Sequence, residues 1–112
     1  MDSKDKKVLD KIIRHVNSIL DYSKDCQTLE DFQRSSMLVE ACVFNLMQIG
    51  ELAKQELSDE GKSQINNIPW KELYGMRNRI VHGYDGVKMN IVWDTIYYDL
   101  PLLKEELEKI NT

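Results

Sequence analysis

Apolar residues recur at intervals of three and four along most of this sequence, and that spacing constrains the fold more than any other feature. On an α-helix it places the apolar side chains on one face. The pattern is clearest over residues 8–20, 32–57 and 91–110. No segment shows a convincing alternation of apolar and polar residues, which would indicate a half-buried strand. We therefore expect an all-α protein.

Capping residues set the limits of the first two expected helices. Asp2 or Ser3 can cap a first helix that fades between residues 21 and 26. Thr28 is a good N-cap for a second helix over residues 29–57. That helix would be roughly 43 Å long, which is long for so small a domain. We therefore expect one of its ends or faces to contact another chain.

A loop and a third helix are expected next. Residues 58–69 are rich in turn-forming residues, and Gly61 is a plausible helix stop. Pro69 suits the first position of a helix over residues 70–82, because its missing N–H would be unpaired there anyway. Gly83 is suited to end that helix as a C-cap.

The fourth expected helix carries the apolar residues from Ile91 to Ile110. Pro101 lies inside it and removes one backbone donor, which predicts a kink near residues 97–100. Four helices with short connections indicate an up-down bundle. We expect residues 1–112 to form a single helical domain.

Charge and cysteine content narrow the function. The 112 residues include 15 Lys and Arg against 19 Asp and Glu, a net charge of −4. This argues against general electrostatic binding of long nucleic acid but does not exclude a small local basic site. Cys26 and Cys42 form no metal-ligand pair, and they are expected to be reduced. We expect no metal and no cofactor.

No membrane or targeting segment is expected. The N-terminal residues are charged and lack the apolar centre of a signal peptide. The most apolar stretch, residues 37–50, is interrupted by Glu40, Asn45 and Gln48 and is shorter than a membrane span requires. A soluble, cytoplasmic protein is the expectation.

Residues with reactive potential concentrate in RNRIVHGY, from Arg77 to Tyr84. Asn78 and Arg79 are helical neighbours of His82, whereas Arg77 lies about 140° around an ideal helix from it. Arginine offers a planar fork of donors to phosphate oxygens, and histidine exchanges protons near neutral pH. This combination suits metal-free cleavage of RNA, in which histidine acts on the ribose 2′-OH or the leaving 5′-oxygen.

A purely structural interpretation stands beside this one. Arginine and histidine at a helix C-terminus are favoured because they face the negative end of the helix dipole. Their spacing alone favours that interpretation. His15, on the first helix beside Arg14, is expected to be a surface or partly buried residue without a role.

Two glycines and a glutamate in the helices are weaker candidates. Gly50 and Gly75 each cost about 1 kcal/mol in a helix interior relative to alanine, so we expect both to allow close helix approach. Glu51 can either orient an arginine or remain a solvated charge, and the second alternative is slightly favoured. We keep it as a supporting site residue with Asn78 and Arg79.

The run from about Ala41 to Ile110 resembles the HEPN superfamily, and specifically its HepT toxin branch. The resemblance rests on four blocks: QIGELAK at 48–54, IPWKELYGMRNRIVHGYDGV at 68–87, VWDTI at 92–96 and DLPLLK at 99–104. The Arg-x₄-His-x-Tyr motif is weak when alone but specific within these blocks. Members of this branch are all-α homodimers whose motifs face a shared cleft.

The resemblance implies a function and roles for single residues. It implies a metal-independent endoribonuclease that is the toxin of a type VII-like toxin–antitoxin system. Arg77 and His82 match the catalytic residues, and Asn78 matches the polar residue that follows the arginine. Tyr84 matches the tyrosine to which an MntA-like nucleotidyltransferase antitoxin attaches AMP. The alternative function is a non-catalytic binding partner of such a nucleotidyltransferase.

Overall fold

The computed structural model describes residues 1–65, 67–68, 70–82 and 88–110, and at residues 80–82 it describes the backbone alone. Every regular element in these parts is helical, so the predicted all-α class is confirmed. Two of the elements, η1 and η3, are π-helical turns that continue a preceding α-helix. The elements are α1 (Ser3–Tyr22), α2 (Leu29–Gln33), α3 (Ser36–Glu51), η1 (Leu52–Glu56), α4 (Asp59–Ser63), α5 (Trp70–His82), α6 (Met89–Asp94), η3 (Thr95–Asp99) and α7 (Leu100–Ile110).

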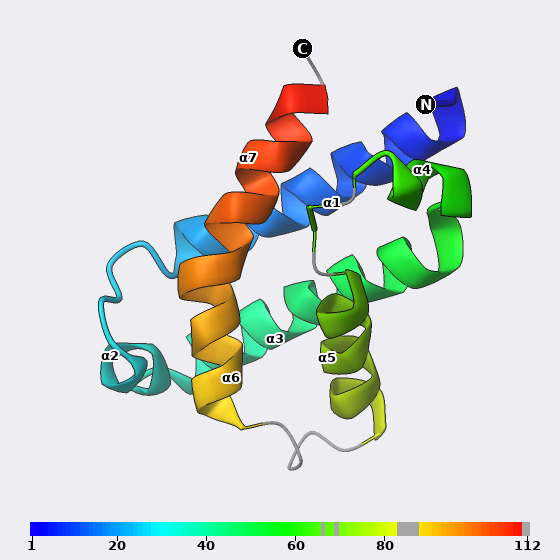
Figure 1. The fold of residues 1–112 in the computed structure, drawn as a ribbon. Coiled ribbons are helices and arrows are strands. Elements are labelled where there is room, and N and C mark those ends of the chain that lie inside the picture. The colour runs from blue at the N-terminus through cyan, green and yellow to red at the C-terminus, as the bar shows by residue number, and fades with distance from the viewer. Residues whose placement is uncertain (66, 69, 83–87, 111–112) are drawn as a thin grey trace.

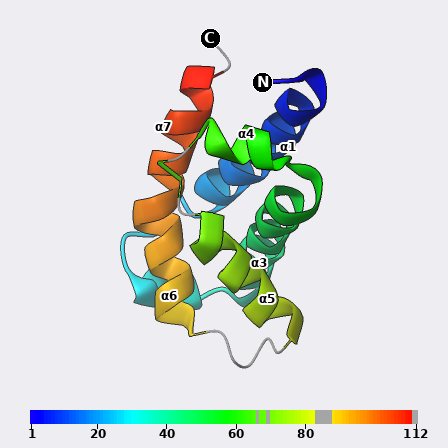
Figure 2. The same cartoon turned by 45° about the vertical axis from the view of Figure 1, so that its right-hand side comes forward.

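The long helices pack as a bundle with crossed layers (Figures 1 and 2). Helix α1 packs along α3, and the column formed by α6, η3 and α7 crosses both. Helix α5 packs against the C-terminal half of α3, and its last turn lies at the same edge of the molecule as the start of α6. The candidate site residues on α5 therefore lie at one end of the bundle.

The first helix begins as predicted, but the prediction of one long second helix over residues 29–57 is wrong. Asp2 caps α1, because its side chain accepts a hydrogen bond from the backbone N–H of Asp5 at 2.7 Å. Thr28 caps only the five-residue α2, and a separate helix then begins after Ser35. The Ser35 side chain accepts from the N–H of Leu38 at 3.2 Å and so caps α3. The expected contact with another chain rested on the length of that helix, so the structure no longer supports it.

The expected loop at 58–69 contains a short helix, α4, which Ser58 caps. Ser58 also ties α4 to α1: its N–H and its hydroxyl donate to the buried carboxylate of Asp5, at 3.0 and 2.5 Å. Gly61 is not a helix stop but lies inside α4, where a Cβ would come within 2.7 Å of Asp5 Oδ2. The two hydrogen bonds from Ser58 hold the pKa of Asp5 below its usual value despite burial.

Asp5 should make the folded state sensitive to acid. Because its pKa is lower in the folded state than in the unfolded chain, its stabilisation is present above the usual carboxylate pKa and is lost as the pH falls through the folded value. We expect Asp5→Asn to cost about 1–3 kcal/mol near neutral pH. Thermal unfolding followed by circular dichroism should show this difference shrinking below about pH 4. A constant difference down to strong acid would contradict the assignment.

The C-terminal half matches the predicted helix limits more closely. Helix α5 covers Trp70–His82 as expected, while Pro69 and Gly83 lie outside the described residues. Near Pro101, where a kink was predicted over residues 97–100, the structure has a π-helical turn, η3 at Thr95–Asp99, between α6 and α7. A proline cannot donate to the carbonyl four residues earlier, so the preceding turn widens.

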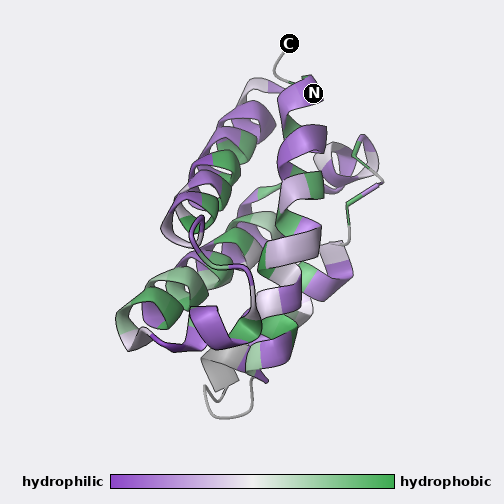
Figure 3. Ribbon diagram, turned by 90° about the vertical axis from the view of Figure 1, so that its left-hand side faces the viewer, coloured by the Kyte–Doolittle hydropathy of each residue, from purple (hydrophilic) through white to green (hydrophobic). Residues whose placement is uncertain are grey.

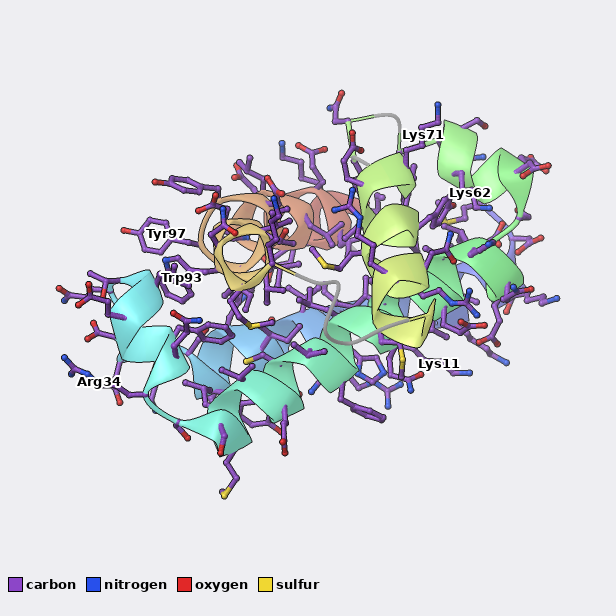
Figure 4. All side chains as sticks on the ribbon, turned by 90° about the horizontal axis from the view of Figure 1, so that it is seen from below. Lys11, Arg34, Lys62, Lys71, Trp93 and Tyr97 are labelled. Carbon is purple, nitrogen blue, oxygen red and sulfur yellow. The ribbon has the colours of Figure 1, made fainter. Side chains whose placement is uncertain are left out.

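The core consists of the apolar faces that the periodicity predicted. Helices show hydrophilic and hydrophobic faces in Figure 3, and the residues least exposed to solvent include Ile12, Phe32 and Leu100. Trp93 stacks on Phe32, with ring centroids 5.4 Å apart, and Tyr97 lies against Trp93 at 5.5 Å (Figure 4).

Among the residues that the structure describes, one helix is long and apolar enough on average to cross a membrane, although its charged and polar residues led us to expect none. It is the continuous run Ser36–Glu56, formed by α3 and η1. Of its most apolar window, 44% is buried inside the fold. The core helix of a soluble protein has the same properties, so this run is weak evidence for a membrane span.

Candidate functional site

The site begins with a close approach of α5 to α3 at Gly50. A Cβ on Gly50 would lie 2.6 Å from Arg77 Cβ and 2.8 Å from the carbonyl oxygen of Leu73, closer than real contacts allow. The predicted role of Gly50 is therefore confirmed. The same prediction for Gly75 is wrong, because no described atom of a neighbouring helix lies within 4 Å of where its Cβ would be.

This approach places the guanidinium of Arg77 beside the end of α3. Its Nε–H donates to Glu51 Oε2, and its Nη1 donates to Asn78 Oδ1 at 2.9 Å. The Arg77 side chain is only 18% exposed, so its position is defined by these partners. A guanidinium has five N–H donors, and among the described residues these two bonds leave three for an anionic ligand.

Glu51 is a partner of Arg77, and the slightly favoured alternative of a solvated charge is wrong. Its side chain is 39% exposed and bonded to the guanidinium. The sequence signal was the preceding Gly50: a glycine in mid-helix marks a close approach of another helix, and the next residue then lies beside that helix. The structure thus brings together Glu51, Arg77 and Asn78.

Arg79 is placed apart from these three residues. It is exposed and lines a groove of about 440 Å³ between α5 and the α6–η3 segment. Three carboxylates share that groove with Arg79 and Lys71: Glu72, Asp94 and Asp99. Burial, and then the charges of Glu72 and Asp94, raise the pKa of Asp99. A groove with this many carboxylates is a poor place for a polyanion.

The remaining site residues are only partly covered. The backbone of His82 ends α5, five residues after Arg77, and its side chain is outside the described part of the structure. Tyr84 lies outside the described residues altogether. The described residues contain no group of three His, Cys, Asp or Glu side chains placed to hold a metal ion.

Comparison with known proteins places this arrangement in a family. The family described as "Ribonuclease HepT-like" matches residues 9–110. A protein of Methanocaldococcus jannaschii, whose name joins a gamma-glutamylcyclotransferase with a provisionally assigned RNase, is 38% identical over 96% of this chain. The match covers 48% of that relative, so this chain spans about half of its length.

Two further relatives match over most of their own length. A provisionally assigned RNase of Caldanaerobacter subterraneus subsp. tengcongensis is 37% identical over 74% of this chain and 73% of its own. A "Probable ribonuclease HepT" of Thermococcus cleftensis is 30% identical over 87% of this chain and 96% of its own. No solved structure matches significantly. The chain belongs to the HepT-like ribonuclease family.

Proposed function

We propose that this chain is a metal-independent endoribonuclease in which Arg77 and His82 are the catalytic residues. The observation that carries the proposal is the state of Arg77: it is largely buried, fixed by Glu51 and Asn78, and has three N–H donors without a partner in the described part of the chain. A positioned guanidinium of this kind suits the charge that develops on phosphorus during RNA cleavage. The family to which the chain belongs is described as ribonuclease, which supports the same activity.

The chemistry requires one proton carrier near that guanidinium. His82 can take the proton from a ribose 2′-OH as its oxygen attacks phosphorus, or give a proton to the 5′-oxygen as the P–O5′ bond breaks. Arg77 stabilises the negative charge on the phosphate oxygens in either step. Because DNA lacks the 2′-OH, this reaction is specific for RNA.

RNA cleavage in the presence of EDTA tests this proposal directly. We expect the purified protein to cut RNA with EDTA present, and His82→Ala to lose about 10²–10⁴-fold in rate. Circular dichroism should show that the variant is folded. Cleavage that depends on added Mg²⁺, or that His82→Ala leaves unchanged, would count against the proposal.

Glu51 should act as a positioning residue for Arg77. Glu51→Ala removes the acceptor of the Arg77 Nε–H, and we expect kcat to fall by about 10- to 100-fold with little change in KM. Glu51→Gln retains an oxygen acceptor and should keep most of the activity. Steady-state kinetics of both variants check this prediction. Equal losses in the two variants would show that the charge of Glu51, and not its hydrogen bond, is what matters.

The role in the cell that we propose is that of a cytoplasmic toxin held inactive by a partner. The Arg-x₄-His-x-Tyr motif supports a nucleotidyltransferase of the MntA type that attaches AMP to Tyr84. A bulky anion there would compete with RNA phosphate for Arg77. Intact mass after incubation with ATP and the partner should rise in steps of one adenylate, and Tyr84→Phe should prevent this.

The alternative function, a non-catalytic partner of the nucleotidyltransferase, predicts different results in the cleavage and mass measurements. It predicts the mass increase at Tyr84 but no RNA cleavage by the unmodified protein. The presence of cleavage, and its loss on adenylylation, would favour the toxin.

A further inference from the structure

A second cationic site lies on the outer surface between α1 and α3. Five side chains line a hollow of about 240 Å³ there, which we call the α1 hollow: Lys11, Arg14, His15, Ser18 and Asn45. None of the five is acidic, in contrast to the groove beside Arg79. Lys11 lies 4.0 Å from Glu56, but Arg14 has no ion-pair partner among the described residues. The lining therefore favours an anion in a protein whose total charge is negative.

His15 is held in place within this hollow by Asn45. Asn45 donates from Nδ2 to the carbonyl of Ala41 at 2.7 Å, so its Oδ1 is the atom that faces His15 Nδ1 at 2.8 Å. Since Oδ1 can only accept, His15 Nδ1 must be the donor. The ring retains Nε2 for another partner. No role for His15 was predicted, because its partner Asn45 is 30 residues away in the sequence.

The α1 hollow lies close to the candidate catalytic residues along α3. Asn45 and Glu51 are six residues apart on this helix, about 9 Å along its axis. Phe44, Gln48 and Glu51 follow at spacings of four and three, so they form one stripe between the α1 hollow and Arg77. Phe44 is 54% exposed, and an exposed aromatic ring is a surface on which an unpaired base can stack.

We propose that the α1 hollow binds a phosphate of single-stranded RNA away from the cleaved bond, with Phe44 stacking on a base between the two sites. This inference rests on the proposed ribonuclease function and extends it to how the substrate is held. Phosphate contacts of this kind position a strand without reading its sequence. The site therefore serves the affinity for longer RNA and not the chemical step.

RNA binding by variants that cannot cleave tests the site. In a His82→Ala background, fluorescence anisotropy with a labelled single-stranded oligonucleotide should show that Arg14→Gln weakens binding about fivefold. It should also reduce the slope of log K against log salt by about 0.7, the value for one phosphate contact on a single strand. Phe44→Ala should weaken binding about tenfold without changing the slope.

Arg34→Gln is a matched control with the same change of charge. Arg34 follows α2, 3.4 Å from Asp31, and lies at the opposite side of the molecule from Lys11 (Figure 4). It should leave both affinity and slope near those of the parent protein. Equal effects of Arg14→Gln and Arg34→Gln would overturn the α1 hollow as a site, since only total charge would then matter. A fall in molar mass with Phe44→Ala would overturn the stacking role, because a second copy would then cover Phe44.

Substrate length separates this site from the catalytic one. With His82 present, Arg14→Gln should raise KM for the oligonucleotide, leave kcat unchanged, and have no effect on a dinucleotide too short to span both sites. Equal effects on both substrates would overturn the inference.

Two outcomes separate this inference from the proposed function. If the wild type cleaves RNA but Arg14→Gln behaves like Arg34→Gln, only this inference fails. If the wild type neither cleaves nor binds RNA, both proposals fail. Unchanged RNA affinity with loss of an acidic protein partner would assign the hollow to that protein instead.

Discussion

A mixture of two inactive variants, Arg77→Ala and His82→Ala, should recover RNA cleavage. Each variant alone should lose about 10²–10⁴-fold in rate. If Arg77 of one protomer acts with His82 of the other, a mixed dimer contains one complete site and one site that lacks both residues. After random exchange, activity should return to about a quarter of the wild-type value, because half of the dimers are mixed and each has one working site of two.

The helix geometry is the reason to expect catalysis across two protomers. Arg77 points to its own α3, where Glu51 holds it. Position 82 lies five residues later, about 140° around the helix and 7.5 Å along its axis. One helix therefore directs the two positions to different sides, whereas a two-fold axis near the end of α5 can bring each arginine to the partner's histidine. We accordingly propose that the active form is a homodimer.

Native mass spectrometry and cleavage assays of the same mixture check this prediction. Refolding the two variants together ensures exchange of protomers. A mixture of Arg77→Ala with Arg77→Gln is the control, since no dimer of these two variants has an arginine at position 77. Mixed dimers without recovered cleavage would show that Arg77 and His82 act within one chain.

The sequence predicted the first helix and the C-terminal helical segments well because apolar periodicity reports directly on burial. Val8, Ile12 and Val16 on α1, and Leu103 and Leu107 on α7, are buried as their spacing required. The apolar periodicity continues across the short break between α2 and α3, however, so it could not show that a new helix begins after Ser35. That break depends on one side chain, which accepts from the N–H of Leu38 in place of a helical carbonyl.

The short helix α4 was missed for a different reason. Its five residues are too few to show a periodic pattern, and Gly61 was predicted to stop a helix. The helix is stabilised by a contact from far away in the sequence, the Asp5 carboxylate, which accepts from Ser58. Gly61 is there to leave room for that carboxylate. Only the folded chain shows such a requirement.

The candidate site was predictable in composition but not in arrangement. Residue types near the end of α5 indicated phosphate chemistry, and the family blocks singled out Arg77 and His82. Spacing on one helix could not show that Glu51, 26 residues earlier, is the partner of Arg77. Nor could it show that Arg79 faces a separate groove, since that depends on how α6 and η3 pack beside α5.

Replacing Gly50 and Gly75 by alanine, one at a time, should change stability in opposite directions. At Gly50 the new methyl group meets Arg77 Cβ and the carbonyl of Leu73 at distances that no rotamer relieves, so α5 must move away from α3. Such overpacking costs about 1–3 kcal/mol, or roughly 4–8 °C in Tm for each kcal/mol. At Gly75 the methyl group meets no described atom of another helix within 4 Å, so alanine should gain up to about 1 kcal/mol through its helix propensity.

Activity should separate the two glycine variants more strongly than stability does. Moving α5 at Gly50 displaces the backbone of Arg77 from Glu51, and a shift of about 1 Å in a catalytic group can cost about 100-fold in rate. Gly75→Ala leaves that contact intact and should cleave RNA like the wild type. Thermal melts and cleavage rates measured well below each Tm test both effects. A stable and fully active Gly50→Ala protein would show that the tight contact between α3 and α5 is not what positions Arg77.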